Sequence, residues 1–472
     1  MPKYYIKTFG CQMNHSDSER IAGFLSSQKF KETENINEAD LVIFNTCGVR
    51  QMAEDRIYGQ IHNLRIRNQK SGIKNQESRI KIILTGCLAN RPDVQKRLKN
   101  KVDLFFPINE FEKFEKFVIE KFENLLKIVN CKLKIPAYPE LTTRKNNTSY
   151  FSITPKYSDK FQAGVPIMTG CNNFCAYCVV PNARGREVSR PTEDIISEIK
   201  ELVKNGTRHI ILLGQNVNSY RGSDKNSSAE EEDKHTNFPQ LLKKINAIPG
   251  KFWISFVSNH PKDVTDEMIE VVAKCKKVCE NFHLPIQAGN DAVLRNMNRK
   301  YTAKEYLKIM RKIKSAFKKH KPAVPFSITS DIIVGFPGET KKQFEDSAEV
   351  MRKAKFDMVF FGKFSPRPET AAWKMKDNVS KMEKERRANY LNEILKKTCF
   401  ENNKKYVGKT LEVLIENKKD ENYFGKTRTM KNVKIVPNFH SDKTSESKNL
   451  IGKIIKVKIT KANIWNLEAI IK

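Results

Sequence analysis

The sequence lacks the long apolar segments that membrane insertion and secretion need. No apolar run in the 472 residues approaches the roughly 18 residues of a membrane helix. The first residues also lack the apolar stretch of a secretion signal. The 10 cysteines do not resemble a disulfide framework in so large a protein. We therefore expect a protein of the reducing cytoplasm that does not bind a membrane.

Acidic residues are scarce relative to basic ones. The chain has 54 Asp+Glu against 86 Lys+Arg, which gives a formal net charge of +32. Such a balance is typical of proteins that bind a polyanion. The many Lys, Asn and Ile residues also fit a compositional bias of the genome, so charge alone does not identify the partner. The length allows two or three domains, and the partner has to be inferred from one of them.

Three cysteines stand close together without a fourth ligand nearby. Cys171, Cys175 and Cys178 have the spacing C-x3-C-x2-C. A cubane iron–sulfur cluster normally takes four thiolates, so three of them predict a cluster with one iron open to a small molecule. A structural zinc site would want another matching Cys or His pair, and zinc or plain buried thiols are the alternatives. Electron carriers usually have C-x2-C-x2-C, so the longer first gap favours an enzyme over a non-catalytic iron–sulfur protein that binds RNA or passes electrons.

Three further cysteines each follow a strand-like apolar run. The runs cover residues 4–9, 41–44 and 80–84, and they precede Cys11, Cys47 and Cys87. The carboxyl ends of parallel strands lie along one edge of a sheet, so the three thiols could meet there. This placement predicts a second cluster. The alternative is three unrelated cysteines in a sheet core.

Several motifs resemble the radical S-adenosylmethionine (SAM) methylthiotransferases over nearly the whole chain. They are Phe-Gly-Cys11-Gln-Met-Asn14, Asn45-Thr-Cys47-Gly-Val-Arg50, Thr-Gly-Cys87-Leu-Ala, Cys178-Val-Val-Pro181, Arg184-Gly-Arg, Asp331-Ile-Ile-Val-Gly335-Phe-Pro-Gly-Glu339 and Phe364-Ser-Pro-Arg367. The resemblance implies two [4Fe-4S] clusters. One, on the central cysteines, cleaves SAM to a 5'-deoxyadenosyl radical, and the other carries sulfur at its open iron. A second SAM then supplies the methyl group.

Within this family, the chain looks most like the branch that methylthiolates C2 of N6-isopentenyladenosine beside the anticodon of tRNA. The segments around Cys47 and Cys178 carry this likeness, although Asn182 stands where that branch often has Tyr. Two alternatives keep the chemistry and change the target. One target is threonylcarbamoyladenosine in tRNA, and the other is an aspartate of a ribosomal protein.

The order of apolar runs predicts an α/β protein of three domains. Strands alternate with helices in the central part, and the resemblance implies that this part is a partial TIM-like barrel. The last part has short alternating runs that predict a small β-barrel, which resembles the TRAM RNA-binding module. The expected boundaries are 1–138 for the N-terminal parallel α/β domain, 139–162 for a linker, 163–380 for the radical SAM domain, 381–405 for a helical linker and 406–472 for the β-barrel.

The resemblance implies that SAM lies across the carboxyl ends of the barrel strands. Candidate SAM-lining residues at these positions are Gln215, Asn216, Asn218, His260, Pro285, Gln287, Asp331 and Gly335. Buried polar groups at strand ends often only satisfy backbone groups, and that alternative holds for each of them.

The C-terminal segment is the candidate contact with nucleic acid. Residues 404–472 contain 16 Lys+Arg and 7 Asp+Glu. Tyr423, Phe424 and Arg428 could stack on or contact an unpaired RNA loop, and an ordinary basic barrel surface is the alternative. The expected partners are the tRNA anticodon stem-loop, a reductant such as flavodoxin or ferredoxin, and proteins that deliver iron–sulfur clusters and sulfur. We expect a monomer.

Overall fold

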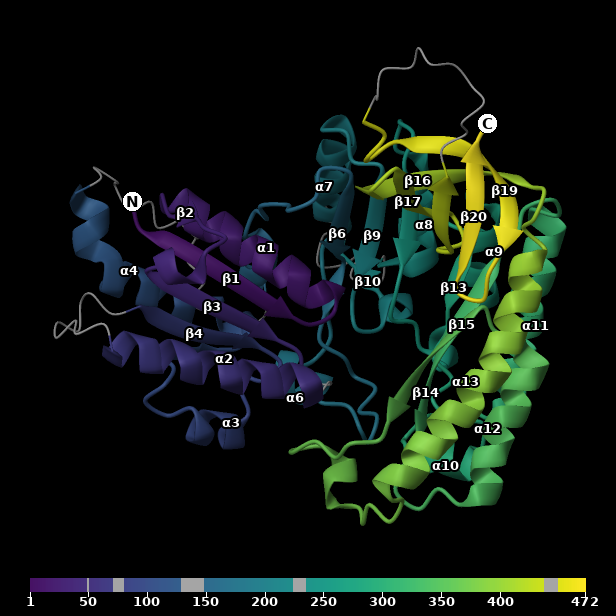
Figure 1. Cartoon of the computed structure of the whole chain (residues 1–472), viewed down its shortest axis with the longest axis horizontal. Helices are drawn as coiled ribbons and strands as arrows, with labels where there is room; N and C mark the ends of the chain where they lie inside the picture. The colour runs from purple at the N-terminus through teal and green to yellow at the C-terminus, as the bar shows by residue number, and fades with distance from the viewer. Residues whose placement is uncertain (49–50, 71–79, 129–147, 224–234, 437–448) are drawn as a thin grey trace. The chain divides into compact units, whose positions relative to one another are not determined.

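The computed structural model describes the chain except for residues 49–50, 71–79, 129–147, 224–234 and 437–448 (Figure 1). The described residues form two compact units. The first comprises Met1–Ser158, Met168–Arg190 and Arg367–Trp373, and the second comprises Asp159–Ile167, Pro191–Pro366 and Lys374–Lys472. Residues 139–147 of the predicted linker lie outside the described residues, so the domain boundaries stay a prediction.

A parallel sheet forms the centre of the first unit, with the strand order β2-β1-β3-β4-β5. The strands are β1 (Lys3–Phe9), β2 (Lys31–Glu32), β3 (Leu41–Thr46), β4 (Lys81–Gly86) and β5 (Leu104–Phe106). All six residues of β3 are buried, because a central parallel strand is covered on both faces. That is why the strand starts with four apolar residues in a row instead of alternating.

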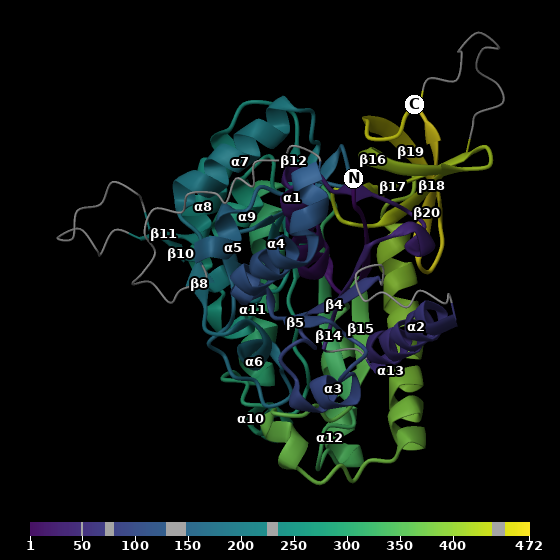
Figure 2. The ribbon, with the colours of Figure 1, turned by 90° about the vertical axis from the view of Figure 1, so that its left-hand side faces the viewer.

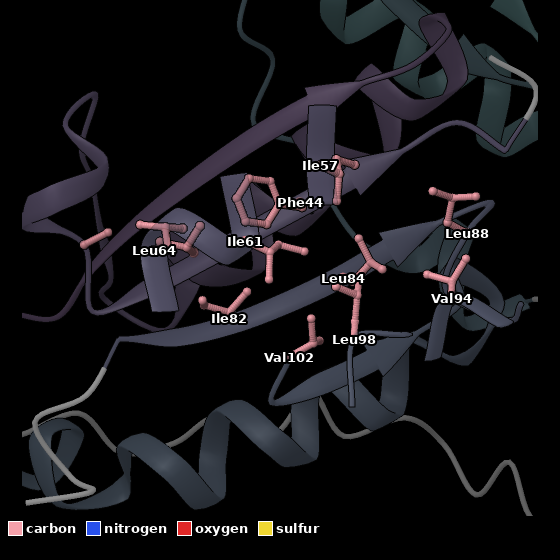
Figure 3. Close-up of a cluster of buried hydrophobic side chains, with 12 residues drawn as sticks. Phe44, Ile57, Ile61, Leu64, Ile82, Leu84, Leu88, Val94, Leu98 and Val102 are labelled. Carbon is pink, nitrogen blue, oxygen red and sulfur yellow. The ribbon is translucent and has the colours of Figure 1, made fainter. Parts of the chain in front are cut away.

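Helices cover both faces of this sheet. They are α1 (Gln12–Ser27), α2 (Gln51–Lys70), α3 (Pro92–Arg97) and α4 (Phe111–Ile128). On one face, Ile57 and Ile61 of α2 pack on Phe44 and Leu84 of the sheet (Figure 3). On the other face, Phe24 of α1 packs edge to face on Phe111 of α4 at a centroid distance of 5.5 Å, and Phe106 of β5 stacks on Phe114 of α4. The two cores hold β3 and β4 rigidly up to their carboxyl ends.

The second unit begins with alternating strands and helices. In chain order they are β6 (Gln162–Pro166), α7 (Thr192–Lys204), β9 (His209–Leu213), α8 (Phe238–Ala247), β12 (Trp253–Phe256), α9 (Asp266–Lys274), β13 (Asn281–His283), α11 (Ala303–His320), β14 (Ser327–Val334), α12 (Lys341–Ala354) and β15 (Met358–Lys363). The strands pair in parallel as β6-β9-β12 and β13-β14-β15. An isolated bridge joins Ile254 of β12 to Val278, three residues before β13. The predicted partial TIM-like barrel is confirmed.

Burial along β14 shows which face of its sheet the helices cover. Ile328, Ile332 and Val334 are at most 2% exposed, whereas the alternating Thr329, Asp331 and Ile333 are only partly buried. Helices α11, α12 and α13 (Lys381–Lys404) lie next to one another on the apolar side (Figure 1). Side chains alternate between the two faces of a strand, so Thr329, Asp331 and Ile333 point to the inside of the partial barrel.

A closed β-barrel follows α13, and Figure 2 shows it at the carboxyl end of that helix. Its strands are β16 (Thr410–Lys419), β17 (Asn422–Thr427), β18 (Asn432–Val436), β19 (Ile454–Ala462) and β20 (Asn466–Ile471). Its core includes Val413, Val433 and Leu467. The predicted C-terminal barrel is therefore confirmed. Within the described part of the chain, none of the helices combines the length and apolar character of a membrane span.

Candidate functional site: two sets of cysteines

The register of the first sheet brings Cys11, Cys47 and Cys87 to one edge. Phe9 of β1 is paired with Thr46 of β3, which is paired in turn with the last residue of β4. The backbone N–H of Cys47 donates to the Phe9 carbonyl (2.7 Å), and that of Cys87 donates to the Thr46 carbonyl (2.8 Å). Cys47 and Cys87 therefore extend the ladder by one residue, and Cys11 follows Phe9 by two residues.

Cys11 is held at this edge by a buried amide network. It is the N-cap of α1, and its Sγ lies 3.3 Å from Oδ1 of Asn14. The Asn14 Nδ2 donates to Oδ1 of Asn45 (2.8 Å), and the Asn45 Nδ2 donates to the Asn14 carbonyl (2.7 Å). Both Asn side chains are fully buried. The network ties the turn of Cys11 to the strand that ends at Cys47.

The loops after β3 and β4 also touch the segment after Cys178. A Cβ built on Gly48 would lie 3.1 Å from Cβ of Cys87 and 3.4 Å from Cγ2 of Val179. Val179 directly follows Cys178, and all these residues belong to the first unit. The missing side chain at position 48 therefore lets the two sets of cysteines approach each other.

Gly86 sets the position of Cys87, and replacing it tests this. Its φ is +84°, and an added Cβ would lie 2.4 Å from the backbone oxygen of Thr46. We expect Gly86→Ala to lower the free energy of unfolding by about 1–3 kcal/mol, because neither the strain nor the clash can relax cheaply. Gly59→Ala, on an exposed position of α2 with nothing within 4 Å, is the matched control. It should stabilise by about 0.4–1 kcal/mol in the same denaturation experiment, and equal effects would contradict this account.

The C-x3-C-x2-C segment forms a tight loop before α6 (Val180–Arg184). The Cys178 N–H donates to the Cys175 carbonyl at 2.9 Å. Burial raises the pKa of Cys171, and burial together with the neighbouring thiols raises the pKa of Cys178 to about 12. Without metal these thiols hold their protons, and bound iron would displace them because thiolates are the ligands.

The side chains around both sets fit iron–sulfur clusters. Three thiols without a fourth ligand among the described residues would leave one iron of a cubane to a small molecule. The hydroxyls of Thr46 and Thr85, which lie beside Cys47 and Cys87, are buried without a hydrogen-bond partner, and such donors suit the anionic sulfurs of a cluster. In the described residues, no three His, Cys, Asp or Glu side chains are grouped to hold a single metal ion.

A buried ion pair connects the two sets. Nη2 of Arg184, at the end of α6, lies 2.5 Å from Oδ2 of Asp17 on α1. The Tyr150 hydroxyl donates to the other carboxylate oxygen at 2.7 Å. The side chains of Asp17 and Arg184 are 0% and 4% exposed. Burial alone would lower the pKa of Arg184, but the Asp17 carboxylate holds it above its ordinary value. The helix that starts at Cys11 is thereby tied to the helix that follows Cys178.

A second buried charge cluster lies behind Cys47. The carboxylate of Glu54 receives Nη1 of Arg91 (2.8 Å) and the hydroxyl of Tyr58 (2.7 Å). Arg367 lies 3.5 Å from the same carboxylate, and burial lowers the pKa of Arg367. Arg91 also forms an ion pair with Asp93 (2.6 Å), so two carboxylates balance the two guanidinium groups of this cluster.

The predicted SAM residues all lie in the second unit, at or near the carboxyl ends of its strands. Gln215 and Asn216 follow β9. Their side-chain carbonyl oxygens are buried without a hydrogen-bond partner, and so is that of Asn259, which follows β12. Three orphaned acceptors fit a ligand that brings donors, such as the amino group and ribose hydroxyls of an adenosine. The sequence reasoning missed Asn259.

The remaining predicted SAM residues have partners in the protein. The Asn218 Nδ2 donates to the His260 carbonyl (2.9 Å), and the His260 N–H donates to the Asn218 Oδ1 (3.0 Å). Burial lowers the pKa of His260 to about 2, and its Nδ1 accepts a backbone N–H. The carbonyl of Pro285 accepts a guanidinium N–H. The backbone of Gln287 donates to the Asp331 carbonyl and accepts from the Ile333 N–H. The Asp331 carboxylate lies 3.5 Å from His283. The Gly335 N–H donates to the Glu339 carboxylate. Their contact with SAM stays a prediction.

The predicted RNA contacts differ in their surroundings. Tyr423 and Phe424 are partly exposed on β17. Arg428 instead forms an ion pair with Glu280 of the partial barrel (2.8 Å), and its Nη2 also donates to the Val278 carbonyl (2.8 Å). Together with the pair between Lys431 and Asp357 (2.8 Å), this contact docks the small barrel. An RNA contact by Arg428 stays a prediction, although its guanidinium already has protein partners.

Known families match most of the chain. Residues 3–107 match the Uncharacterized protein family UPF0004, residues 165–351 the Radical SAM superfamily and residues 404–472 the TRAM domain. A tRNA-2-methylthio-N(6)-dimethylallyladenosine synthase of Acetivibrio thermocellus is 38% identical, over 98% of this chain and 90% of that protein. Proteins of the same name from Clostridium botulinum (39%, covering 98% and 96%) and Thermoanaerobacter pseudethanolicus (38%, covering 98% and 92%) are similar. The chain belongs to the tRNA-2-methylthio-N(6)-dimethylallyladenosine synthase family.

Membership in this synthase family makes the chain a sulfur-transferring radical SAM enzyme that uses iron–sulfur clusters and SAM. Among solved structures, a radical SAM methyltransferase, TsrM, from Kitasatospora setae covers 79% of this chain and 75% of its own, at 11% identity and a TM-score of 0.49. That likeness is too distant to bear on the reaction.

Some features of this synthase were not expected from its sequence. Tyr150, Glu54 and Arg91 had no predicted role, yet each is part of a buried polar cluster beside the cysteines. The local sequence gives no signal for them, because Glu54 stands beside Asp55 and Arg56, and Arg91 lies close to Asp93. Asn182, the departure from the branch pattern, donates from Nδ2 to the Glu369 carbonyl (2.8 Å) and so has a structural contact of its own.

Proposed function

We propose that the protein replaces the C2 hydrogen of N6-dimethylallyladenosine, beside the anticodon of tRNA, with a methylthio group. The observation that carries this proposal is that the loops of both cysteine sets meet at Gly48 and Val179 within one unit. Similarity over 98% of the chain to synthases of that name supports it.

Each cysteine set has its own task in this proposal. Cys171, Cys175 and Cys178 hold the cluster that binds and cleaves SAM, and Cys11, Cys47 and Cys87 hold the cluster that carries sulfur. A radical is needed because acid–base groups and ordinary nucleophiles do not replace hydrogen on an aromatic carbon. The orphaned oxygens of Gln215, Asn216 and Asn259 accept hydrogen bonds from SAM.

Two features of the chain position the substrate and the cysteine sets. The Asp17–Arg184 pair fixes the two cysteine sets relative to each other. The basic C-terminal barrel binds the stem-loop through phosphate contacts, and Tyr423 and Phe424 contact unpaired bases. The adenosine lies in a single-stranded loop, so placing it in the site costs little unstacking energy.

We further propose the surroundings in which the protein works. A low-potential protein such as flavodoxin or ferredoxin supplies electrons, and separate proteins supply clusters and sulfur. The protein acts in the cytoplasm as a monomer. Its +32 charge suits an RNA substrate and explains why salt should weaken binding.

Modified-nucleoside analysis tests the substrate. We expect tRNA from cells without the gene to lose 2-methylthio-N6-dimethylallyladenosine and to accumulate N6-dimethylallyladenosine. Expression of the wild-type gene should restore the product, and expression of a Cys175→Ala variant should not. The proposal would be wrong if the amount of 2-methylthio-N6-dimethylallyladenosine were unchanged while the methylthio derivative of threonylcarbamoyladenosine, or of a ribosomal aspartate, disappeared.

A further inference from the structure

The inner face of β13, β14 and β15 carries a row of partly exposed side chains. Asp331 of β14 is directly paired with Phe360 of β15, and Ile333 is paired with Gly362. His283 of β13 pairs with Thr329, two residues before Asp331. These residues share one face because positions two apart on a strand point the same way. The helices cover the other face, as the burial of Ile332 shows.

Phe360 is the most conspicuous member of this row. Its side chain is 60% exposed, more than that of any other Phe or Trp in the described part of the chain. Its neighbour Val359, on the helix side, is 3% exposed. An apolar ring left in water on the inside of a parallel barrel indicates a surface that a ligand covers.

Polar groups lie next to this ring. Oδ2 of Asp331 is 3.5 Å from Nε2 of His283, and their side chains are 36% and 16% exposed. The His283 ring meets the Phe360 ring edge to face, with 6.4 Å between centroids. Nδ1 of His283 is 2.9 Å from the Thr329 hydroxyl, which fixes the orientation of the imidazole. The face therefore combines an aromatic ring with an accessible carboxylate.

An apolar corner adjoins Phe360 on the other side. Gly362 is exposed and has no side chain, and a Cβ built on it would be 3.8 Å from Cγ1 of Ile333. The space above Gly362 is therefore bounded by an aliphatic side chain and, two residues away, by a phenyl ring. A short branched alkyl group fits such a corner.

We propose that this face binds the N6-dimethylallyl adenine of the substrate. The five-carbon group fills the corner between the Phe360 ring, Ile333 and Gly362, the adenine lies beside it on the same face, and N6–H donates to the Asp331 carboxylate. This assigns Asp331 to the nucleoside in place of the SAM contact predicted from the sequence. The inference rests on the proposed function and adds the residues that select the substrate.

The same face disfavours the threonylcarbamoyl group. That substituent ends in a carboxylate, which would meet the like charge of Asp331 and the apolar corner at Ile333. Burying a charge against apolar atoms without a partner is costly. The dimethylallyl group has no polar atom and gains from the same contacts.

Binding of anticodon stem-loop RNA to the full-length, cluster-reconstituted protein, without SAM or reductant, tests the inference. Fluorescence anisotropy is measured with three stem-loops, which carry adenosine, N6-dimethylallyladenosine or threonylcarbamoyladenosine at the target position. We expect the wild type to bind the dimethylallyl stem-loop about tenfold more tightly than the plain one, because burying several CH₂-sized groups is worth at least that much. Phe360→Ala should reduce this preference to about twofold.

Three further variants make the test specific. Gly362→Leu fills the corner and should abolish the preference, whereas Phe360→Tyr keeps the ring and should retain it. Met382→Ala, which removes another exposed large apolar side chain in the same unit, should change nothing. Thermal denaturation of each variant checks that it is folded.

The outcomes separate this inference from the proposed function. If Phe360→Ala and Gly362→Leu keep the full preference while the wild type makes the methylthio product, the inference is wrong and the proposed function stands. If the wild type makes no such product from the dimethylallyl stem-loop, the proposed function itself fails. A loss of preference confined to Phe360→Ala and Gly362→Leu supports the inference.

Discussion

Replacing Cys11, Cys47 and Cys87 together by alanine is expected to abolish the methylthio product while SAM cleavage continues. In the proposed function the three residues hold only the sulfur-carrying cluster, and the central set keeps its own ligands in a different loop. We expect product to fall at least about 100-fold, since no other group supplies sulfur, and 5'-deoxyadenosine to form within about threefold of the wild-type rate. Anaerobic incubation with SAM, dithionite and dimethylallyl stem-loop RNA measures both.

Two companion variants make this result interpretable. Alanine at Cys171, Cys175 and Cys178 should abolish 5'-deoxyadenosine and product alike. Cys399→Ala removes a buried thiol that bonds the Asp357 carbonyl in the second unit, and it should leave both reactions intact. The assignment of separate tasks to the two cysteine sets would be refuted if the variant with alanine at Cys11, Cys47 and Cys87 still formed the methylthio product.

Asp17→Ala is expected to cost about 3–5 kcal/mol of stability in the first unit. It leaves the Arg184 guanidinium buried without its carboxylate, and removing one partner of a buried ion pair has costs of this size. Chemical denaturation followed by near-ultraviolet circular dichroism measures the change. An exposed pair, Lys156 with Glu32 at 2.7 Å, provides the matched control, and Glu32→Ala should cost less than about 1 kcal/mol.

A double-mutant cycle measures how much of the stability lost by Asp17→Ala comes from the broken ion pair with Arg184 and how much from lost packing. The variant with both Asp17→Ala and Arg184→Met has no unpaired charge and should recover part of the stability lost by Asp17→Ala. If the pair also positions the two cysteine sets, Asp17→Asn should raise the ratio of 5'-deoxyadenosine to methylthio product. An unchanged ratio, with stability losses that simply add, would show that the pair has no such role.

The sequence predicted that the strands before Cys11, Cys47 and Cys87 end at one edge of a parallel sheet, because a local pattern marks such strands. Apolar runs that end at a Gly or Thr beside a Cys mark buried parallel strands, and parallel strands end at the same edge. β1, β3 and β4 follow that rule. The alternation of strands and helices likewise predicted the partial barrel, since each unit of it is a local pattern.

Tertiary contacts decide the features that the sequence did not predict. β17 contains Gly425 and polar residues, and it forms because its neighbours β16 and β18 supply pairing on both sides. Arg428 has the residue type of an RNA contact, but the partner that it meets, Glu280, lies 148 positions away in the sequence. The Asp17–Arg184 pair spans 167 positions, so no pattern in a single sequence reveals it.

Iron and sulfide analysis, with Mössbauer spectra of protein reconstituted without oxygen, tests the central claim most directly. Two clusters on six cysteines predict about eight iron and eight sulfide per chain, with spectra of [4Fe-4S] type. Either triple alanine variant should retain about half of each, because the two sets bind independently. Wild-type protein that binds only about four iron, or that binds zinc in place of iron, would contradict the account.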